Sequence, residues 1–171
     1  MKMRLQTYGL LLFSFGLILL LSACSGPQNV KLKVGNVILR PGERGTVTIS
    51  VINPPDLKMI QVGPVGKLTF DPTVIHVIAV RGINGFQVLA SGIDNVAGEV
   101  QFAAGFPGSS IGPIKNGWVW VKLAIIELEV EAVGDSGAFC ALEVSAVDLL
   151  ADRNGREIML AGIIAGEVIL R

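Results

Sequence analysis

The sequence predicts an all-β protein, a two-sheet β-sandwich of about nine short strands. The 171 residues include 21 glycines and 8 prolines, which indicate many turns. Apolar and polar residues alternate with a period of two, which is typical of strands with one buried side. No segment has the apolar periodicity of an amphipathic helix, beyond a single turn near 133–136.

The first 23 residues have the features of an export signal, so they are excluded from the prediction of the fold. Lys2 and Arg4 precede an apolar run over 10–21, which is shorter than the roughly 20 residues of a membrane-spanning helix. The run ends in Leu21-Ser22-Ala23-Cys24, which resembles the lipobox of bacterial lipoproteins. An ordinary secretory signal with an incidental cysteine is the alternative.

The lipobox resemblance divides the chain into three parts. It implies a signal peptide over 1–23, a lipidated tether over 24–28 that begins with a diacylglyceryl group on the Cys24 thiol, and a folded domain over 29–171. Two or more acyl chains anchor a protein stably, whereas one does not. The expected location is therefore the cell envelope, lipid-anchored and extracytoplasmic.

The first half of the domain carries the clearest strand signal. Residues 46–51 alternate without a fault, so Val47, Ile49 and Val51 are expected to face one core. A strand over 57–62 and 67–70, interrupted at 63–66, is expected next, followed by 74–80 and 100–103. A long glycine-spaced stretch, 81–99, separates the last two.

The second half begins with a glycine- and proline-rich loop over 106–117, and the strand pattern resumes over 118–133. Within it, Glu127, Glu129 and Glu131 alternate with apolar residues, so they face water or a partner, because burial of an unpaired carboxylate is prohibitive. Glu143 and Ser145 lie in a similar alternation. Residues 152–156 form an Asn-Gly turn, and 166–170 form the last strand.

The order of these strands and turns resembles that of the cohesin family, the receptor modules that bind dockerins in cellulosome-type assemblies. The resemblance spans roughly 29–170 and rests on the order of many short motifs. The segments that carry it are 30–35, 41–51, 68–72, 74–82, 123–130, Gly137, 149–158 and 166–168. The chain departs from the family pattern at 63–66 and in the bulky Trp118-Val119-Trp120.

The cohesin resemblance implies a nine-stranded two-sheet β-sandwich with jelly-roll-like topology, which binds a partner without catalysis. One flat face of the sandwich would dock a dockerin-containing or other envelope protein, in a context of polysaccharide catabolism, and hold it at the cell surface. Any calcium would belong to the partner, so no cofactor is expected on this chain. Outward-facing polar residues are the candidate contacts, namely Glu127, Glu129, Glu131, Glu143 and Ser145. For any one of these residues, an ordinary solvated sheet face is the more common explanation.

Several function classes are disfavoured by composition. Lys and Arg total 14 against 14 Asp and Glu with no basic run, which argues against nucleic acid, because phosphate neutralisation needs clustered cations. His76 is the sole histidine, which disfavours both a catalytic triad and a zinc site. Cys140 lies in an apolar run and is expected to be a buried, inert thiol.

Two non-catalytic alternatives remain open. A carbohydrate-binding module would stack a polysaccharide on exposed rings; Trp118 and Trp120 point to one side of their strand, with Phe106 at the far end of the preceding loop. If that side is buried, the rings belong to the core, where Phe70, Phe102 and Phe139 are also expected. The other alternative is a structural surface lipoprotein that assembles with itself or with an envelope complex.

Overall fold

The structure of the protein is a computed structural model, which describes residues 29–54, 56–108, 114–115, 118–119 and 122–171. The predicted signal peptide 1–23, the tether 24–28 and the lipidation site Cys24 lie outside the described residues. The described part of the chain is all-β and contains no helix. It therefore offers no helical segment long and apolar enough to cross a membrane.

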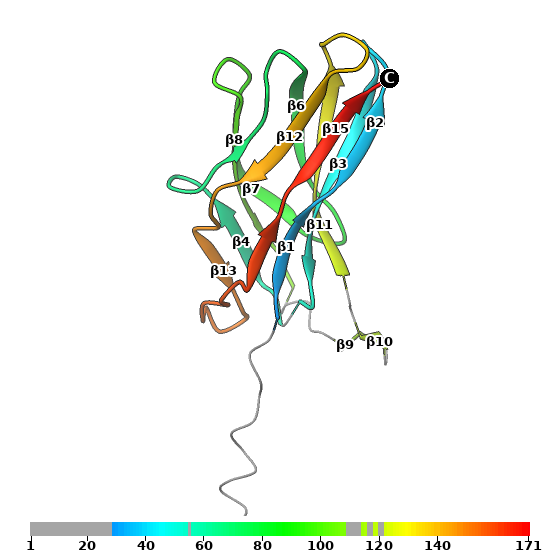
Figure 1. The fold of residues 1–171 in the computed structure, drawn as a ribbon. Helices are drawn as coiled ribbons and strands as arrows, with labels where there is room; N and C mark the ends of the chain where they lie inside the picture. Colours follow the sequence, from blue (N-terminus) through cyan, green and yellow to red (C-terminus); the bar gives the residue numbers. More distant parts are fainter. Residues whose placement is uncertain (1–28, 55, 109–113, 116–117, 120–121) are drawn as a thin grey trace, which may run out of the picture.

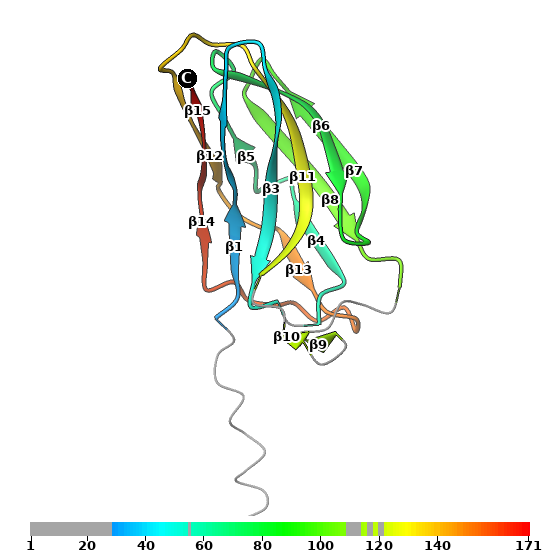
Figure 2. The ribbon, with the colours of Figure 1, turned by 90° about the vertical axis from the view of Figure 1, so that its right-hand side faces the viewer.

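Two sheets pack face to face (Figures 1 and 2). The five-stranded sheet has the order β14 (Gly162–Ile164), β1 (Lys31–Val34), β3 (Arg44–Ile52), β11 (Lys122–Ala132) and β6 (Ile75–Gly82). The eight-stranded sheet has the order β13 (Leu149–Ala151), β4 (Met59–Val62), β8 (Glu99–Gly105), β5 (Leu68–Thr69), β12 (Phe139–Val144), β15 (Gly166–Leu170) and β2 (Asn36–Leu39), with β7 (Gln87–Asp94) on the far side of β8. Separately, β9 (Ile114–Lys115) pairs antiparallel with β10 (Trp118–Val119).

The two-sheet sandwich is confirmed, but within the described residues the two sheets contain 13 strands rather than nine. Part of the difference arises where a strand leaves one sheet for the other. The chain switches sheets at Gly35, between β1 and β2, and again between β14 and β15. These crossings approach so closely that a Cβ on Gly166 would lie 2.2 Å from the Gly35 carbonyl oxygen, so this position requires glycine.

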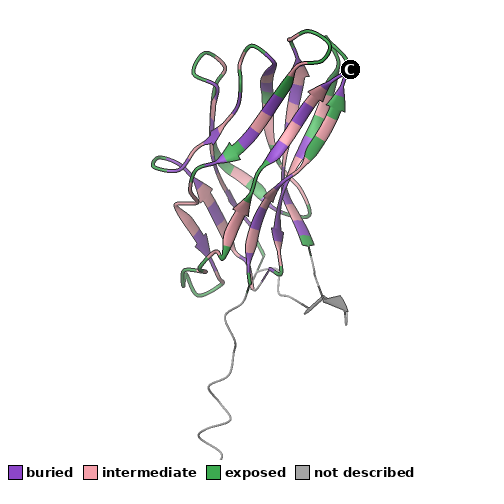
Figure 3. Ribbon diagram, in the orientation of Figure 1, coloured by how far each residue is buried: buried purple, intermediate pink, exposed green. Residues whose placement is uncertain are grey.

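The core between the sheets follows the predicted alternation (Figure 3). Val47, Ile49 and Val51 are buried as expected, and so are Phe70 and Phe102. Phe139 was expected in the core, but its side chain is 57% exposed. Cys140 points inward on β12, so its neighbour must point outward.

β7 lies inside the glycine-spaced stretch 81–99, to which the sequence pattern had assigned no strand. Seven of its eight residues are exposed, so the alternation that marks a half-buried strand is missing. A β-bulge between Val88 and Ala90 interrupts what alternation remains. Its pairing with β8 is therefore a tertiary feature that local periodicity does not predict.

A candidate binding face on the eight-stranded sheet

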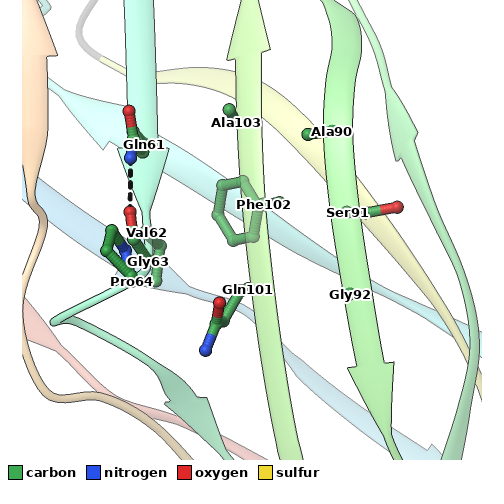
Figure 4. Close-up of a pocket in the computed structure, with 10 residues that line it drawn as sticks. All are labelled: Gln61, Val62, Gly63, Pro64, Ala90, Ser91, Gly92, Gln101, Phe102 and Ala103. Carbon is green, nitrogen blue, oxygen red and sulfur yellow. Dashed lines mark hydrogen bonds between the residues drawn. The ribbon is translucent and has the colours of Figure 1, made fainter.

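The outer face of the eight-stranded sheet is hollowed over β8, between β4 and β7 (Figure 4). The shallow pocket there has a volume of about 310 Å³. Its lining residues come from β4, β7, β8 and the turn after β4 and are Gln61, Val62, Gly63, Pro64, Ala90, Ser91, Gly92, Gln101, Phe102 and Ala103. Phe102 is almost completely buried, so Gln101 and Ala103 are the β8 side chains that face outward.

Strand register explains why this part of the face is hollow. Ala103 lies between Gln61 on β4 and Ala90 on β7, and Gln101 lies beside Gly92. Paired residues of adjacent strands point to the same side of a sheet. Small side chains on β7 and β8 therefore face outward together, and a depression remains between them.

The turn after β4 forms one wall of the pocket. Gly63 has a φ of 122°, and a Cβ there would lie 2.9 Å from the Cβ of Gln101. Only glycine fits this backbone beside β8. The Asp148 carboxylate accepts hydrogen bonds from the backbone N–H groups of Gly63 and Gly66, so the wall is fixed to the segment before β13.

Apolar and acidic side chains surround the pocket. Leu89 and Val65 are exposed large hydrophobic residues near it. An acidic row crosses the same face, because Glu143, Thr69, Glu99 and Asp94 are consecutive cross-strand neighbours on β12, β5, β8 and β7. Lys67 neutralises one member, with its Nζ 2.7 Å from the Glu99 carboxylate.

The five predicted contact residues lie on opposite faces of the sandwich. Glu143 and Ser145 are exposed on the eight-stranded sheet, where the Ser145 hydroxyl accepts a 3.0 Å hydrogen bond from the Lys67 backbone N–H. Glu127, Glu129 and Glu131 point outward from β11 in the other sheet. One flat partner cannot contact both sets at once.

Ion pairs already occupy two of the three β11 carboxylates. Arg81 lies 2.6 Å from Glu129, and Arg44 lies 3.9 Å from the same carboxylate. Arg44 also lies 3.7 Å from Glu131. A partner that contacted these carboxylates would have to compete with both guanidinium groups.

The aromatic residues proposed for sugar stacking do not form a described platform. Phe106 is partly buried against the core, with its ring centroid 5.7 Å from that of Phe86 and the rings tilted by 56°. Trp118 belongs to β10, but its side chain lies outside the described part of the structure, and Trp120 lies outside the described residues altogether.

Cys140 and His76, the two side chains considered for catalysis, lie on strands β12 and β6. Cys140 is buried, and burial raises the pKa of its thiol, so the reactive thiolate is disfavoured. Its Sγ accepts a 3.2 Å hydrogen bond from the Asp71 backbone N–H. His76 is half-buried on β6, opposite Glu131. Among the described residues, no group of three His, Cys, Asp or Glu side chains could hold a metal ion.

Some residues of this face escaped the sequence analysis. Ala90 and Gly92 were missed because β7 was missed, although the glycine-rich turn at 63–66 had been noted as an interruption. Small residues carry no chemical signal of their own. Only the strand register shows that they gather beside Gln101 and Ala103.

Comparison with known proteins supplies a fold match. No family model and no curated protein matches the chain. A cohesin of Clostridium thermocellum, solved in the OlpA cohesin complex with the dockerin Doc918, matches with a TM-score of 0.65 and 15% identity over 84% of this chain and 99% of that one.

Two further matches come from other organisms. The cohesin CaCohA2 of Clostridium acetobutylicum matches with a TM-score of 0.57 and 19% identity over 84% of this chain and 92% of that one. A non-cellulosomal cohesin of the archaeon Archaeoglobus fulgidus matches with a TM-score of 0.58 and 14% identity over 84% of this chain and 91% of that one. The protein therefore has the cohesin fold.

Proposed function

We propose that the protein is a receptor module that binds a dockerin-type module of a partner protein through the outer face of the eight-stranded sheet. The observation that carries this proposal is the cohesin fold over more than four-fifths of the chain, since several of the matched cohesins were solved with dockerins. No cofactor is needed on this chain, and any calcium belongs to the partner.

The physical character of the two faces favours the eight-stranded sheet. Its pocket is lined mostly by small, uncharged side chains, whose desolvation costs little when a partner covers them. Leu89 and Val65 nearby offer apolar surface to bury. On the other sheet, a partner would have to desolvate the paired charges of Arg44, Arg81 and Glu129, which costs free energy unless each charge is paired again.

The decisive experiment is capture with and without calcium. The full chain, immobilised, is exposed to envelope and secreted proteins of the source organism in calcium and again in chelator. Recovery of proteins that share a dockerin module, and their loss in chelator, is the expected result. Retention on polysaccharide instead, abolished by Trp118→Ala or Trp120→Ala, would replace the proposal with the sugar-binding alternative.

We also propose that a lipid on Cys24 holds this module at the cell envelope, where its partner would be an enzyme or adhesin of polysaccharide catabolism. The sequence Leu21-Ser22-Ala23-Cys24 supports the anchor. Metabolic labelling with a fatty acid should label the wild-type chain and not Cys24→Ser. Equal labelling of both chains, or none of either, would remove the anchor from the proposal and leave the binding face untouched.

A further inference from the structure

The outer face of the five-stranded sheet divides into two halves of different charge. In one half, the Glu129 carboxylate of β11 is paired with Arg44 and Arg81. The other half contains the start of β1, the end of β3 and the start of β11. Its outward-facing residues on these strands include lysines and no carboxylate.

Strand register brings the lysines of this half together. Lys31 and Lys33 point outward, because they alternate with buried residues of β1. Ile52 of β3 pairs with Lys31 on one side and with Lys122 on the other, and Lys33 pairs with Ile164 of β14. Paired residues of adjacent strands point to the same side of a sheet. These five side chains therefore share one surface, which we call the tether-end patch.

The lysines of the tether-end patch have no partner of opposite charge within the described residues. Lys122 is exposed, Lys31 and Lys33 are partly exposed, and Ile164 is 39% exposed. Unpaired cations with apolar side chains between them suit an anionic membrane surface. The ammonium groups meet the headgroup phosphates, while the apolar side chains reach the boundary with the acyl chains.

The patch also lies close in sequence to the predicted lipid. β1 begins at the end of the sandwich opposite the C-terminus (Figures 1 and 2), and Lys31 is its first residue. Lys31 follows Cys24 by seven positions, so the two residues are separated by at most about 25 Å even in a fully extended chain. A lipid on Cys24 would therefore hold the patch within a few Debye lengths of the headgroups.

We propose that the tether-end patch lies against the anionic headgroups of the membrane that holds the lipid on Cys24. This inference rests on the lipid anchor proposed above and adds an orientation to it. When this half of the five-stranded sheet leans on the bilayer, the outer face of the eight-stranded sheet points away from it. The face proposed for docking is then open to a partner protein.

Charge sets both the attraction and its limit. Each lysine near an anionic surface shifts the equilibrium between a leaning and an upright domain about fivefold toward the leaning one. Glu127 and Glu129, further along the same face, would be repelled by the same headgroups. The domain therefore leans on the membrane through its tether end and does not lie flat.

The test is quenching of a fluorescent dye on the full chain, lipidated in a bacterial host and reconstituted into vesicles. The dye is placed on Gly162→Cys, beside Lys31, where an added Cβ meets no atom within 4 Å. The matched control carries it on Val65→Cys, 80% exposed in the turn after β4. The vesicles contain phosphatidylcholine alone or mixed with anionic phosphatidylglycerol, each with the same nitroxide-labelled headgroup lipid as quencher.

We expect the dye at Gly162→Cys to be quenched at least about twofold more in the anionic membrane than in the neutral one. The dye at Val65→Cys should be quenched little, and equally, in both. High salt should remove the difference at Gly162→Cys, because screening weakens the attraction between lysines and headgroups.

Charge variants test the lysines themselves. A variant with Lys31→Gln, Lys33→Gln and Lys122→Gln should lose the difference between the two membranes. The matched control removes three positive charges at the opposite end of the sandwich and should keep the difference; it carries Arg40→Gln, Arg44→Gln and Arg171→Gln.

Flotation with the vesicles separates failure of the anchor from failure of the patch. A wild type that floats with neither membrane would lack the lipid, and the proposal would fall together with the anchor. A wild type that floats with both membranes but is quenched equally in both would keep the anchor and overturn the patch. Equal loss in the lysine and arginine variants would also overturn it, as would a lysine-dependent retention on acidic polysaccharide without any response to the anionic membrane.

Discussion

The two outer faces of the sandwich differ in how far their side chains are already paired within the molecule. On the five-stranded sheet, Arg44 and Arg81 surround Glu129, and Arg44 also lies near Glu131. On the eight-stranded sheet, small uncharged residues leave a pocket over β8, with exposed apolar side chains nearby. Exposed carboxylates alone therefore do not mark a docking face, because separating a charge from its partner within the molecule costs free energy.

The largest expected effect contrasts the two sides of one strand, β11. Leu128 is completely buried between the sheets, and Leu128→Ala should lower the free energy of unfolding by about 2–5 kcal/mol through lost burial and the cavity left behind. Glu127→Ala, on the adjacent outward position, should change it by less than about 0.5 kcal/mol. Denaturant unfolding measures both, and similar losses would contradict this account of the core.

The next effect separates the two faces by binding. Ala103→Arg fills the pocket with a charged side chain and should weaken binding of the dockerin-type partner by about 2 kcal/mol or more, roughly 30-fold. Thr46→Arg adds the same charge to an exposed position of the five-stranded sheet and should leave binding unchanged. Calorimetric titration against the captured partner makes the measurement, and the reverse pattern would move the docking face to the other sheet.

A smaller effect concerns a buried hydroxyl on the five-stranded sheet. Ser50 is completely buried, and its Oγ is the one buried side-chain polar atom without a hydrogen-bond partner among the described residues. Ser50→Ala removes that cost and should raise the free energy of unfolding by about 1 kcal/mol. Thermal unfolding provides the measurement, with Thr48→Ala on the same strand as control; a clear loss of stability in Ser50→Ala would mean that the hydroxyl is bonded.

The ion pairs of the five-stranded sheet should contribute less to the free energy of unfolding. Glu129→Gln removes both arginine contacts of that carboxylate, yet the arginines are more than half exposed, so the loss of unfolding free energy should be only about 0.5 kcal/mol. The loss should shrink in high salt, because screening weakens the wild-type pairs. A large, salt-independent loss would show that this carboxylate supports the fold by other means.

The smallest expected effect is the change of stability with pH that three aspartates in turns produce. Hydrogen bonds lower the pKa of three aspartate carboxyls: from the Thr73 side chain to Asp71, from the Ala97 N–H to Asp94, and from the Arg156 N–H to Asp152. Each ionised carboxylate therefore contributes to the free energy of unfolding. That contribution is complete above the ordinary aspartate pKa of about 3.9 and is lost as the pH falls through the lower pKa of the folded state.

The melting temperature should therefore decline as the solution is acidified from about pH 5 to about pH 2. A variant that carries Asp71→Asn, Asp94→Asn and Asp152→Asn should show a shallower decline, because none of its three side chains titrates. An unchanged slope in that variant would assign the acid sensitivity to other carboxyls.

Much of the fold was predictable because alternation along one strand reports burial directly. The pattern over 46–51 placed Val47, Ile49 and Val51 in the core, and Cys140 was rightly expected to be buried. The same reasoning failed for Phe139, whose place among apolar neighbours suggested a core residue, although the pleat directs it outward. Hydrophobicity of a segment does not reveal which of its residues face inward.

The candidate face was only partly predictable for a similar reason. Glu143 and Glu127 have the same local pattern, an acid between two buried apolar residues, yet they lie on opposite sheets. Nothing in either segment names the sheet to which it belongs. That assignment depends on which distant strand each one pairs with.

The sequence by itself determined the class of this protein: an all-β sandwich, with the cohesin resemblance, an inert thiol and an outward row of acids on β11. Those properties depend on residues near each other in the chain, where side-chain alternation and turn preferences act directly. The tertiary structure alone decided where the strands divide, which carboxylates are paired with arginine, and where small residues leave a pocket. These depend on register between strands that are far apart in sequence, and a shift of one residue in that register exchanges the buried and exposed sides of a strand.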